Sequence, residues 1–185
     1  MYKVLLVDDE AGIVSAVRRV LAGIAPADLD GDRLHVEACL DPREALERCQ
    51  DGGFDLVISD YRMPGMSGVE FLAAVADSQP QTARLLLSGY ADLDAIIGAL
   101  NEARVFRFIP KPWNEHELRI AVIQALSVRA LQLDNQRLAD LVRRQEDELG
   151  SRDAELRRLE SEHPGITRLR EDDMGGIFID EDDLD

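Results

Sequence analysis

The chain has 185 residues, which gives room for one domain of ordinary size plus an appendage. Its formal charge of −16, from 37 acidic and 21 basic residues, repels nucleic-acid phosphates and argues against DNA binding by this chain alone. No apolar run approaches the roughly 20 residues of a membrane-spanning helix, and the two cysteines form no metal-binding motif. We therefore expect a cytoplasmic protein that binds neither nucleic acid nor membrane.

The N-terminal part alternates short apolar runs with amphipathic segments. Residues 2–7 predict a strand, and the apolar residues of 13–21 recur at helical spacing. Residues 34–40 predict a second strand. The sequence Asp41-Pro42-Arg43-Glu44 then predicts a helix start, with the aspartate as N-cap, the proline in the first turn and the glutamate closing a capping box.

The same alternation continues through the next part of the chain. Residues 54–59 predict a buried strand, which runs into a loop rich in proline and glycine. Ser67-Gly68-Val69-Glu70 is a second capping box that opens a helix. Residues 82–88 and 105–109 predict two further strands, with a helix between them that begins at Asp92. Five strands that alternate with helices predict an α/β protein, in which a parallel sheet is covered on both faces.

Several polar residues lie at or just past the ends of these strands. Asp8 and Asp9 follow the first strand, Asp60 follows the third, Ser88 ends the fourth and Lys111 lies just past the fifth. Since the carboxyl ends of parallel strands meet at one edge, we expect these side chains to lie together. Neighbouring carboxylates repel one another unless a cation neutralises them, and their oxygens suit Mg²⁺. Asp60 can then attack a phosphoryl group, while Ser88 and Lys111 hold its oxygens.

The sequences around these positions resemble the receiver domain of two-component response regulators, in the CheY-like superfamily. The resemblance covers about residues 1–126, and it implies a doubly wound, flavodoxin-like fold with strand order 2-1-3-4-5. The segments that carry it are Val7-Asp8-Asp9-Glu10, Ile58-Ser59-Asp60-Tyr61-Arg62-Met63-Pro64-Gly65-Met66-Ser67-Gly68, Leu87-Ser88-Gly89-Tyr90 and Phe108-Ile109-Pro110-Lys111-Pro112.

The resemblance also implies a role for each acidic residue. Asp60 would accept a phosphoryl group from a sensor histidine kinase. Asp9 and Asp60 would bind Mg²⁺ directly, together with the backbone carbonyl of Arg62, and Asp8 would act mainly through water.

The remaining family positions concern the phosphoryl group and the response to it. Ser88 and Lys111 would contact the phosphoryl oxygens, and Ser88 and Phe108 would form the switch, with a change of rotamer at Phe108. The bond between Lys111 and the next proline is a candidate cis peptide. We further hypothesise that the bulky side chains of Arg62 and Tyr90 slow the loss of the phosphoryl group.

The last predicted helix can extend from Glu115 to about Glu162, because no proline intervenes. A heptad pattern continues along it from residue 128, and one asparagine at an a position favours a parallel two-stranded coiled coil. The a positions are Val128, Asn135, Val142, Leu149 and Leu156, and the d positions are Leu131, Leu138, Gln145, Arg152 and Leu159.

We therefore predict a homodimer through residues 128–163. Like-charged flanking pairs, Glu148 with Asp153 and Glu155 with Glu160, weigh against it. A single solvated helix, or pairing with a more basic helix, stays open as an alternative. The predicted organisation is a receiver at 1–126, an extended helix at 127–163 and an acidic, disordered tail at 164–185.

These features predict a response regulator rather than an enzyme. Phosphorylation of Asp60 would switch protein–protein interactions, with output through a downstream effector protein rather than DNA. One alternative is a scaffold with a receiver fold that signals without phosphorylation. Another is a phosphohydrolase with an aspartate nucleophile, which usually needs an acid two residues later, where Arg62 stands.

Overall fold

The computed structural model describes residues 1–89 and 103–164. It divides into two compact units, residues 1–134 and 135–185. The helix predicted from Asp92, Tyr90 and the tail from residue 165 lie outside the described residues. Within the described part of the chain, no helix is both long enough and apolar enough to cross a membrane.

The first unit contains the predicted parallel sheet, in the predicted strand order β2-β1-β3-β4-β5. Its strands are β1 (Tyr2–Val7), β2 (Leu34–Cys39), β3 (Leu56–Asp60), β4 (Ala83–Gly89) and β5 (Arg107–Lys111). The last strand begins two residues later than predicted. Arg104 has a positive φ of 46°, and the turn that it forms delays the start of β5.

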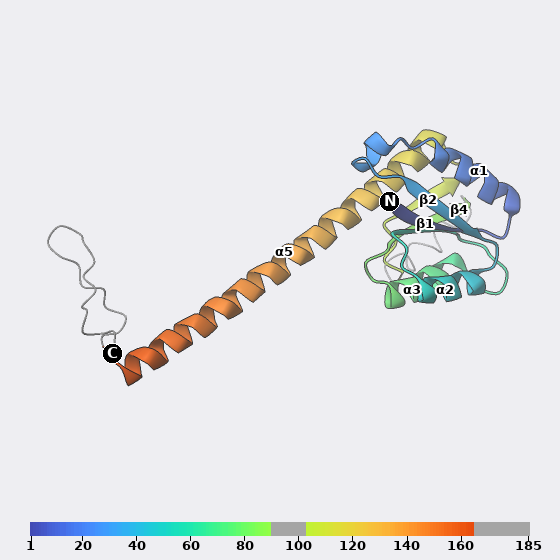
Figure 1. Ribbon diagram of the computed structural model, residues 1–185. Helices are drawn as coiled ribbons and strands as arrows, with labels where there is room; N and C mark the ends of the chain where they lie inside the picture. Colours follow the sequence, from blue (N-terminus) through green and yellow to red (C-terminus); the bar gives the residue numbers. More distant parts are fainter. Residues whose placement is uncertain (90–102, 165–185) are drawn as a thin grey trace. The chain divides into compact units, whose positions relative to one another are not determined.

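Helices cover both faces of this sheet. In Figure 1, α1 lies on one side of the strands, and α2 and α3 lie on the other. The helices are α1 (Ala11–Ala22), α2 (Pro42–Asp51), α3 (Gly68–Ser78) and α5 (Glu115–Glu162). A short 3-10 turn, η1 (Pro26–Leu29), lies in the connection between α1 and β2.

The helix starts follow the capping signals with one exception. Ser67 Oγ accepts from the Glu70 backbone N–H at 3.2 Å, and Glu70 Oε2 accepts from the Ser67 N–H at 2.8 Å, which confirms that capping box. Asp41 Oδ1 accepts from the Arg43 N–H at 2.8 Å. The predicted capping role of Glu44 is wrong, because its carboxylate accepts from Arg48 Nη2 at 2.6 Å, one turn further along the helix.

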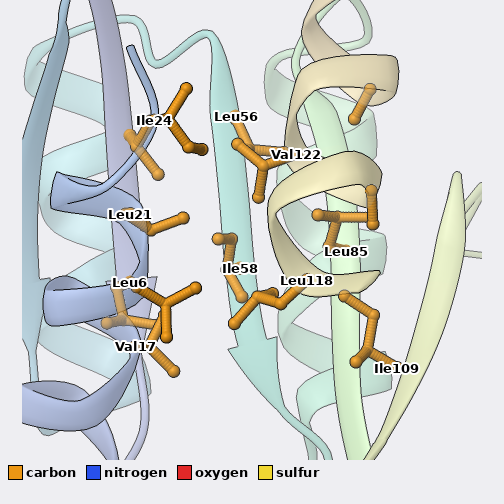
Figure 2. Close-up of a cluster of buried hydrophobic side chains, with 14 of the residues drawn as sticks. Leu6, Val17, Leu21, Ile24, Leu56, Ile58, Leu85, Ile109, Leu118 and Val122 are labelled. Atoms are coloured by element: carbon orange, nitrogen blue, oxygen red, sulfur yellow. The ribbon is translucent and has the colours of Figure 1, made fainter. Parts of the chain in front are cut away.

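The strands alternate their side chains between two buried clusters, one on each face of the sheet. Figure 2 shows the cluster under α1 and the first turns of α5, with Val17, Leu21, Leu118 and Val122 from the helices and Leu6, Ile58, Leu85 and Ile109 from the strands. The opposite cluster includes Leu5, Val57, Phe71, Leu72, Val75 and Leu86. Each of these large side chains stabilises the fold by roughly 1.5–3 kcal/mol when fully buried.

A polar contact joins α5 to the sheet just after its buried turns. Arg129 Nη1 lies 2.7 Å from Asp55 Oδ1, and Arg129 Nε donates to the carbonyl of Gln81 at 2.9 Å. The second oxygen of Asp55 accepts from the Lys3 backbone N–H at 2.6 Å. The carboxylate of Asp55, just before β3, therefore links α5 with β1.

In the second unit, residues 135–158 are exposed. Their large apolar side chains are each at least half exposed, and they are Leu138, Leu141, Val142, Leu149 and Leu156. Within the described residues, these side chains therefore have no apolar cover.

Candidate functional site at the carboxyl edge of the sheet

The structure brings three of the predicted site residues into direct contact. Asp8 directly follows β1, Asp60 is the last residue of β3 and Lys111 is the last residue of β5. Lys111 Nζ lies 2.8 Å from Asp8 Oδ2 and 2.6 Å from Asp60 Oδ1. One ammonium group therefore bridges two carboxylates that come from different strands.

Burial and the contacts between Asp8 and Lys111 have opposite effects on the pKa of each of these two groups. Asp8 is fully buried, and burial raises the pKa of its carboxyl group, although hydrogen bonds from Lys111 and Glu10 oppose that change. For Lys111 the largest influence is burial, which lowers its pKa, but the bonds to Asp60 and Asp8 outweigh burial and raise the pKa overall. Lys111 therefore stays a cation at neutral pH.

Both carboxylate oxygens of Asp60 accept a hydrogen bond. Its Oδ1 accepts from Lys111, and its Oδ2 accepts from the backbone N–H of Arg62 at 2.9 Å. The side chain is 9% exposed, so it is held at the edge of the core with limited access to solvent. This arrangement fixes the carboxylate in one orientation.

Gly68 allows α3 to pack directly behind Asp60. Its N–H donates to the carbonyl of Tyr61 at 2.8 Å, and a Cβ added at this position would lie 1.9 Å from the carbonyl oxygen of Asp60. Only a residue without a side chain fits there. This requirement for glycine was not predicted from the sequence, where its one signal is a glycine directly after the capping serine, a position that tolerates most residues.

Ser88 lies on β4, at the same edge of the sheet. Its side chain is buried, and its hydroxyl oxygen has no hydrogen-bond partner among the described residues. An unpaired buried hydroxyl is costly, so such a group is usually retained for a ligand or a water. The bond between Lys111 and Pro112 is cis, which confirms the prediction.

Other predicted site residues take no part in the bridge that Lys111 forms with Asp8 and Asp60. Asp9 is exposed, because successive residues at the end of a strand point in opposite directions. Among the described residues there is no group of three His, Cys, Asp or Glu side chains close enough to hold a metal ion. Arg62 is exposed, and Phe108 belongs to neither buried cluster, with 36% of its surface exposed.

Residues 4–123 match the model of the response regulator receiver domain family. The chain is 38% identical over 135 residues to the hydrogenase transcriptional regulatory protein HoxA of Cupriavidus necator, covering 73% of this chain and 26% of HoxA. It is 32% identical over 171 residues to the C4-dicarboxylate transport transcriptional regulatory protein DctD of Pseudomonas aeruginosa, covering 91% of this chain and 33% of DctD.

A solved structure, the signal receiver domain of an HD domain-containing protein from Pseudomonas fluorescens Pf-5, matches with a TM-score of 0.62 and 33% identity. The match covers 72% of this chain and 92% of that one. Although the chain spans only about a quarter to a third of the length of HoxA and DctD, the family match covers most of its own residues. The chain therefore belongs to the response regulator receiver family of two-component systems.

Proposed function

We propose that this chain is a phosphoacceptor, in which a sensor histidine kinase transfers a phosphoryl group to Asp60. The observation that carries the proposal is the bridge from Lys111 to Asp8 and Asp60. The hydroxyl of Ser88, which has no hydrogen-bond partner among the described residues, lies at the same edge of the sheet. A carboxylate held in one orientation beside a cation suits nucleophilic attack on phosphorus.

In the transfer, a phosphorus–oxygen bond forms to a carboxylate oxygen of Asp60 while the phosphorus–nitrogen bond of the kinase phosphohistidine breaks, and the imidazole leaves. Lys111 stabilises the negative charge of the phosphoryl oxygens during the transfer, because its ammonium group already contacts the attacking carboxylate. Ser88 donates its hydroxyl to a phosphoryl oxygen, which gives that buried group a partner.

No three of the described carboxylates lie close enough together to share one ion, but the donor atoms at this edge are of the kind that Mg²⁺ binds. They are hard oxygens, from the carboxylates of Asp8, Asp9 and Asp60 and from the backbone carbonyl of Arg62, and Mg²⁺ binds such ligands while keeping several waters. The ion supplies positive charge against the phosphoryl oxygens when it is bound. Asp8 and Asp60 are already positioned on one ammonium, and Asp9 is the exposed member of the set.

Signalling follows from changes around the phosphorylated residue. Ser88 moves toward the phosphoryl group, and Phe108 changes rotamer. Phe108 is partly exposed, and it has no hydroxyl that could form a new hydrogen bond, so its part in the switch is a change of packing. We further propose that the bulky side chains of Arg62 and Tyr90 slow hydrolysis and lengthen the life of the phosphorylated state. Arg62→Ala should therefore shorten it.

We propose that output passes through an effector protein rather than through DNA bound by this chain. The net charge of −16 and the exposed apolar side chains of α5 support protein contacts. HoxA and DctD are transcriptional regulators, and they extend well beyond the length matched here. A receiver at 1–126, followed by an extended helix at 127–163 that forms a homodimer, fits this role.

The phosphoacceptor is tested by incubating the full chain with Mg²⁺ and an acyl phosphate and measuring its intact mass. We expect one phosphoryl group per chain, lost in Asp60→Asn. Asp77→Asn, which neutralises an exposed carboxylate on α3, is the matched control and should be phosphorylated like the wild type. Rapid turnover of phosphomonoesters would instead indicate the hydrolase, and an unmodified chain the scaffold.

A further inference from the structure

The last three heptads of α5 have apolar a positions and acidic flanks, whereas two of their three d positions, Gln145 and Arg152, are polar. The a positions of this stretch are Val142, Leu149 and Leu156, which are 51%, 59% and 50% exposed. All six flanking e and g positions between residues 146 and 162 are acidic, and they are Glu146, Glu148, Asp153, Glu155, Glu160 and Glu162. We name residues 142–162 the acidic seam.

The arginines of this stretch lie mostly outside the flanks. Arg143, Arg144, Arg157 and Arg158 occupy the b and c positions. Arg158 Nη2 lies 2.7 Å from Glu155 Oε1, so this base contacts an acid from the outer side of the helix. One base, Arg152, is at a seam position, which is a d position of the heptad. Both flanks of the seam therefore carry the same sign.

This charge pattern opposes pairing with a second copy of the same stretch. In a parallel pair, Glu148 would face Asp153 and Glu155 would face Glu160, each twice by symmetry, and Arg152 would face its own copy. In an antiparallel pair, acidic e positions would face each other, as would acidic g positions. Self-pairing of the acidic seam is therefore disfavoured in both orientations.

The first two heptads lack this pattern. Their flanking residues are Gln132, Asp134, Ala139 and Leu141, of which only Asp134 is charged. This part, residues 128–141, can pair with its own copy without repulsion along both flanks, so the homodimer proposed for the extended helix narrows to this part. The extended helix therefore carries two different surfaces in succession.

We propose that the acidic seam binds a basic amphipathic helix of another protein, as one strand of a heterotypic coiled coil. The partner helix has apolar residues at its a and d positions and Lys or Arg at e and g, which complement the six acids. It has an acid at the d position opposite Arg152. This inference extends beyond phosphotransfer, because it depends only on the pattern of α5.

The test uses a fluorescent peptide of about 28 residues, well above the roughly 12–15 residues below which isolated helices are marginal. The Lys probe has Leu at a and d, Glu at the d position facing Arg152, and Lys at every e and g. The Glu probe is identical except for Glu at e and g. Fluorescence anisotropy with the full chain, without Mg²⁺ or phosphodonor, should show at least tenfold tighter binding of the Lys probe, with the difference shrinking as salt rises.

Charge variants of the chain complete the test. Glu148→Lys with Glu155→Lys should weaken Lys-probe binding at least tenfold, and it should strengthen self-association in sedimentation, because each parallel flanking pair becomes oppositely charged. Asp140→Lys with Asp147→Lys makes the same change of net charge at f positions, away from the seam, and should leave the probe preference intact. Equal binding of the two probes, or equal effects of the two double variants, would overturn the proposal. Since no phosphorylation is involved, failure here would leave the role of Asp60 unaffected.

Discussion

Gly68→Ala should disturb stability and phosphotransfer together. The new Cβ would lie 1.9 Å from the Asp60 carbonyl oxygen, 2.8 Å from the Asp60 carbonyl carbon and 3.0 Å from Leu86 Cδ1. Two of these three atoms belong to the backbone, so rotation of a side chain cannot relieve the contact. Overpacking usually costs 1–3 kcal/mol, and a clash between backbone and Cβ belongs at the upper end, so we expect a loss of about 3 kcal/mol. For a domain of this size, that corresponds to a fall in Tm of roughly 10 °C.

The displacement falls on Asp60, whose carboxylate is the proposed nucleophile. Either the end of β3 or the start of α3 must move, and a shift of about 1 Å at a reacting group can slow a reaction about a hundredfold. We expect the phosphorylation rate of Gly68→Ala to fall by that order, measured by intact mass over time at a temperature where the variant is folded.

Gly12→Ala is the matched control. Gly12 lies in α1, and a Cβ there has no atom within 4 Å among the described residues. The change should stabilise the protein by roughly 0.5–1 kcal/mol, because alanine is the better helix former. If thermal unfolding and phosphorylation of Gly68→Ala match the wild type, the close packing of α3 on Asp60 is not required, and the reasoning is refuted.

Three further predictions follow from the site, the core and the helix. Lys111→Gln should lower the phosphorylation rate about a hundredfold, as loss of one preorganised donor does elsewhere, and an unchanged rate would contradict its assigned role. Burial raises the pKa of the Cys49 thiol from its ordinary value of 9.0 to about 11. The neutral thiol therefore favours the folded state below pH 9.0, and this contribution to the free energy of unfolding should be lost as the pH rises from 9.0 to about 11. Denaturant titrations from neutral to alkaline pH, with Cys49→Ala as the reference, measure this loss, and parallel curves would rule it out. Leu138→Glu should shift a homodimer to monomer in sedimentation, whereas Ala154→Glu, at an f position, should leave the dimer intact.

Local patterns were sufficient for most of the fold. The limits of β1 were predicted to the residue because an apolar run ends there at consecutive acids, and α5 ends where predicted because Pro164 lies just beyond it. The capping role of Glu44 was wrong because Arg48, one turn later, competes for the same carboxylate. The delayed start of β5 depends on the backbone of Arg104, which composition does not reveal.

At the site, topology was the predictable part. Asp8, Asp60 and Lys111 meet because parallel strands place their carboxyl ends at one edge, a consequence of strand order alone. The direction of a side chain just past a strand is less predictable, and Asp9 is exposed. The contact between Asp55 and Arg129 joins residues far apart in the chain, so no local pattern indicates it.

Because Lys111 bridges Asp8 and Asp60, the protein itself supplies a cation to these two carboxylates. Asp8 is buried with an ammonium at 2.8 Å, so its charge is compensated from within the polypeptide. Withdrawal of divalent ions by a chelator should therefore abolish the chemistry while the architecture persists. If Asp60 is the phosphoacceptor as proposed, the contacts among Asp8, Asp60 and Lys111 are already formed before an ion or a phosphodonor binds.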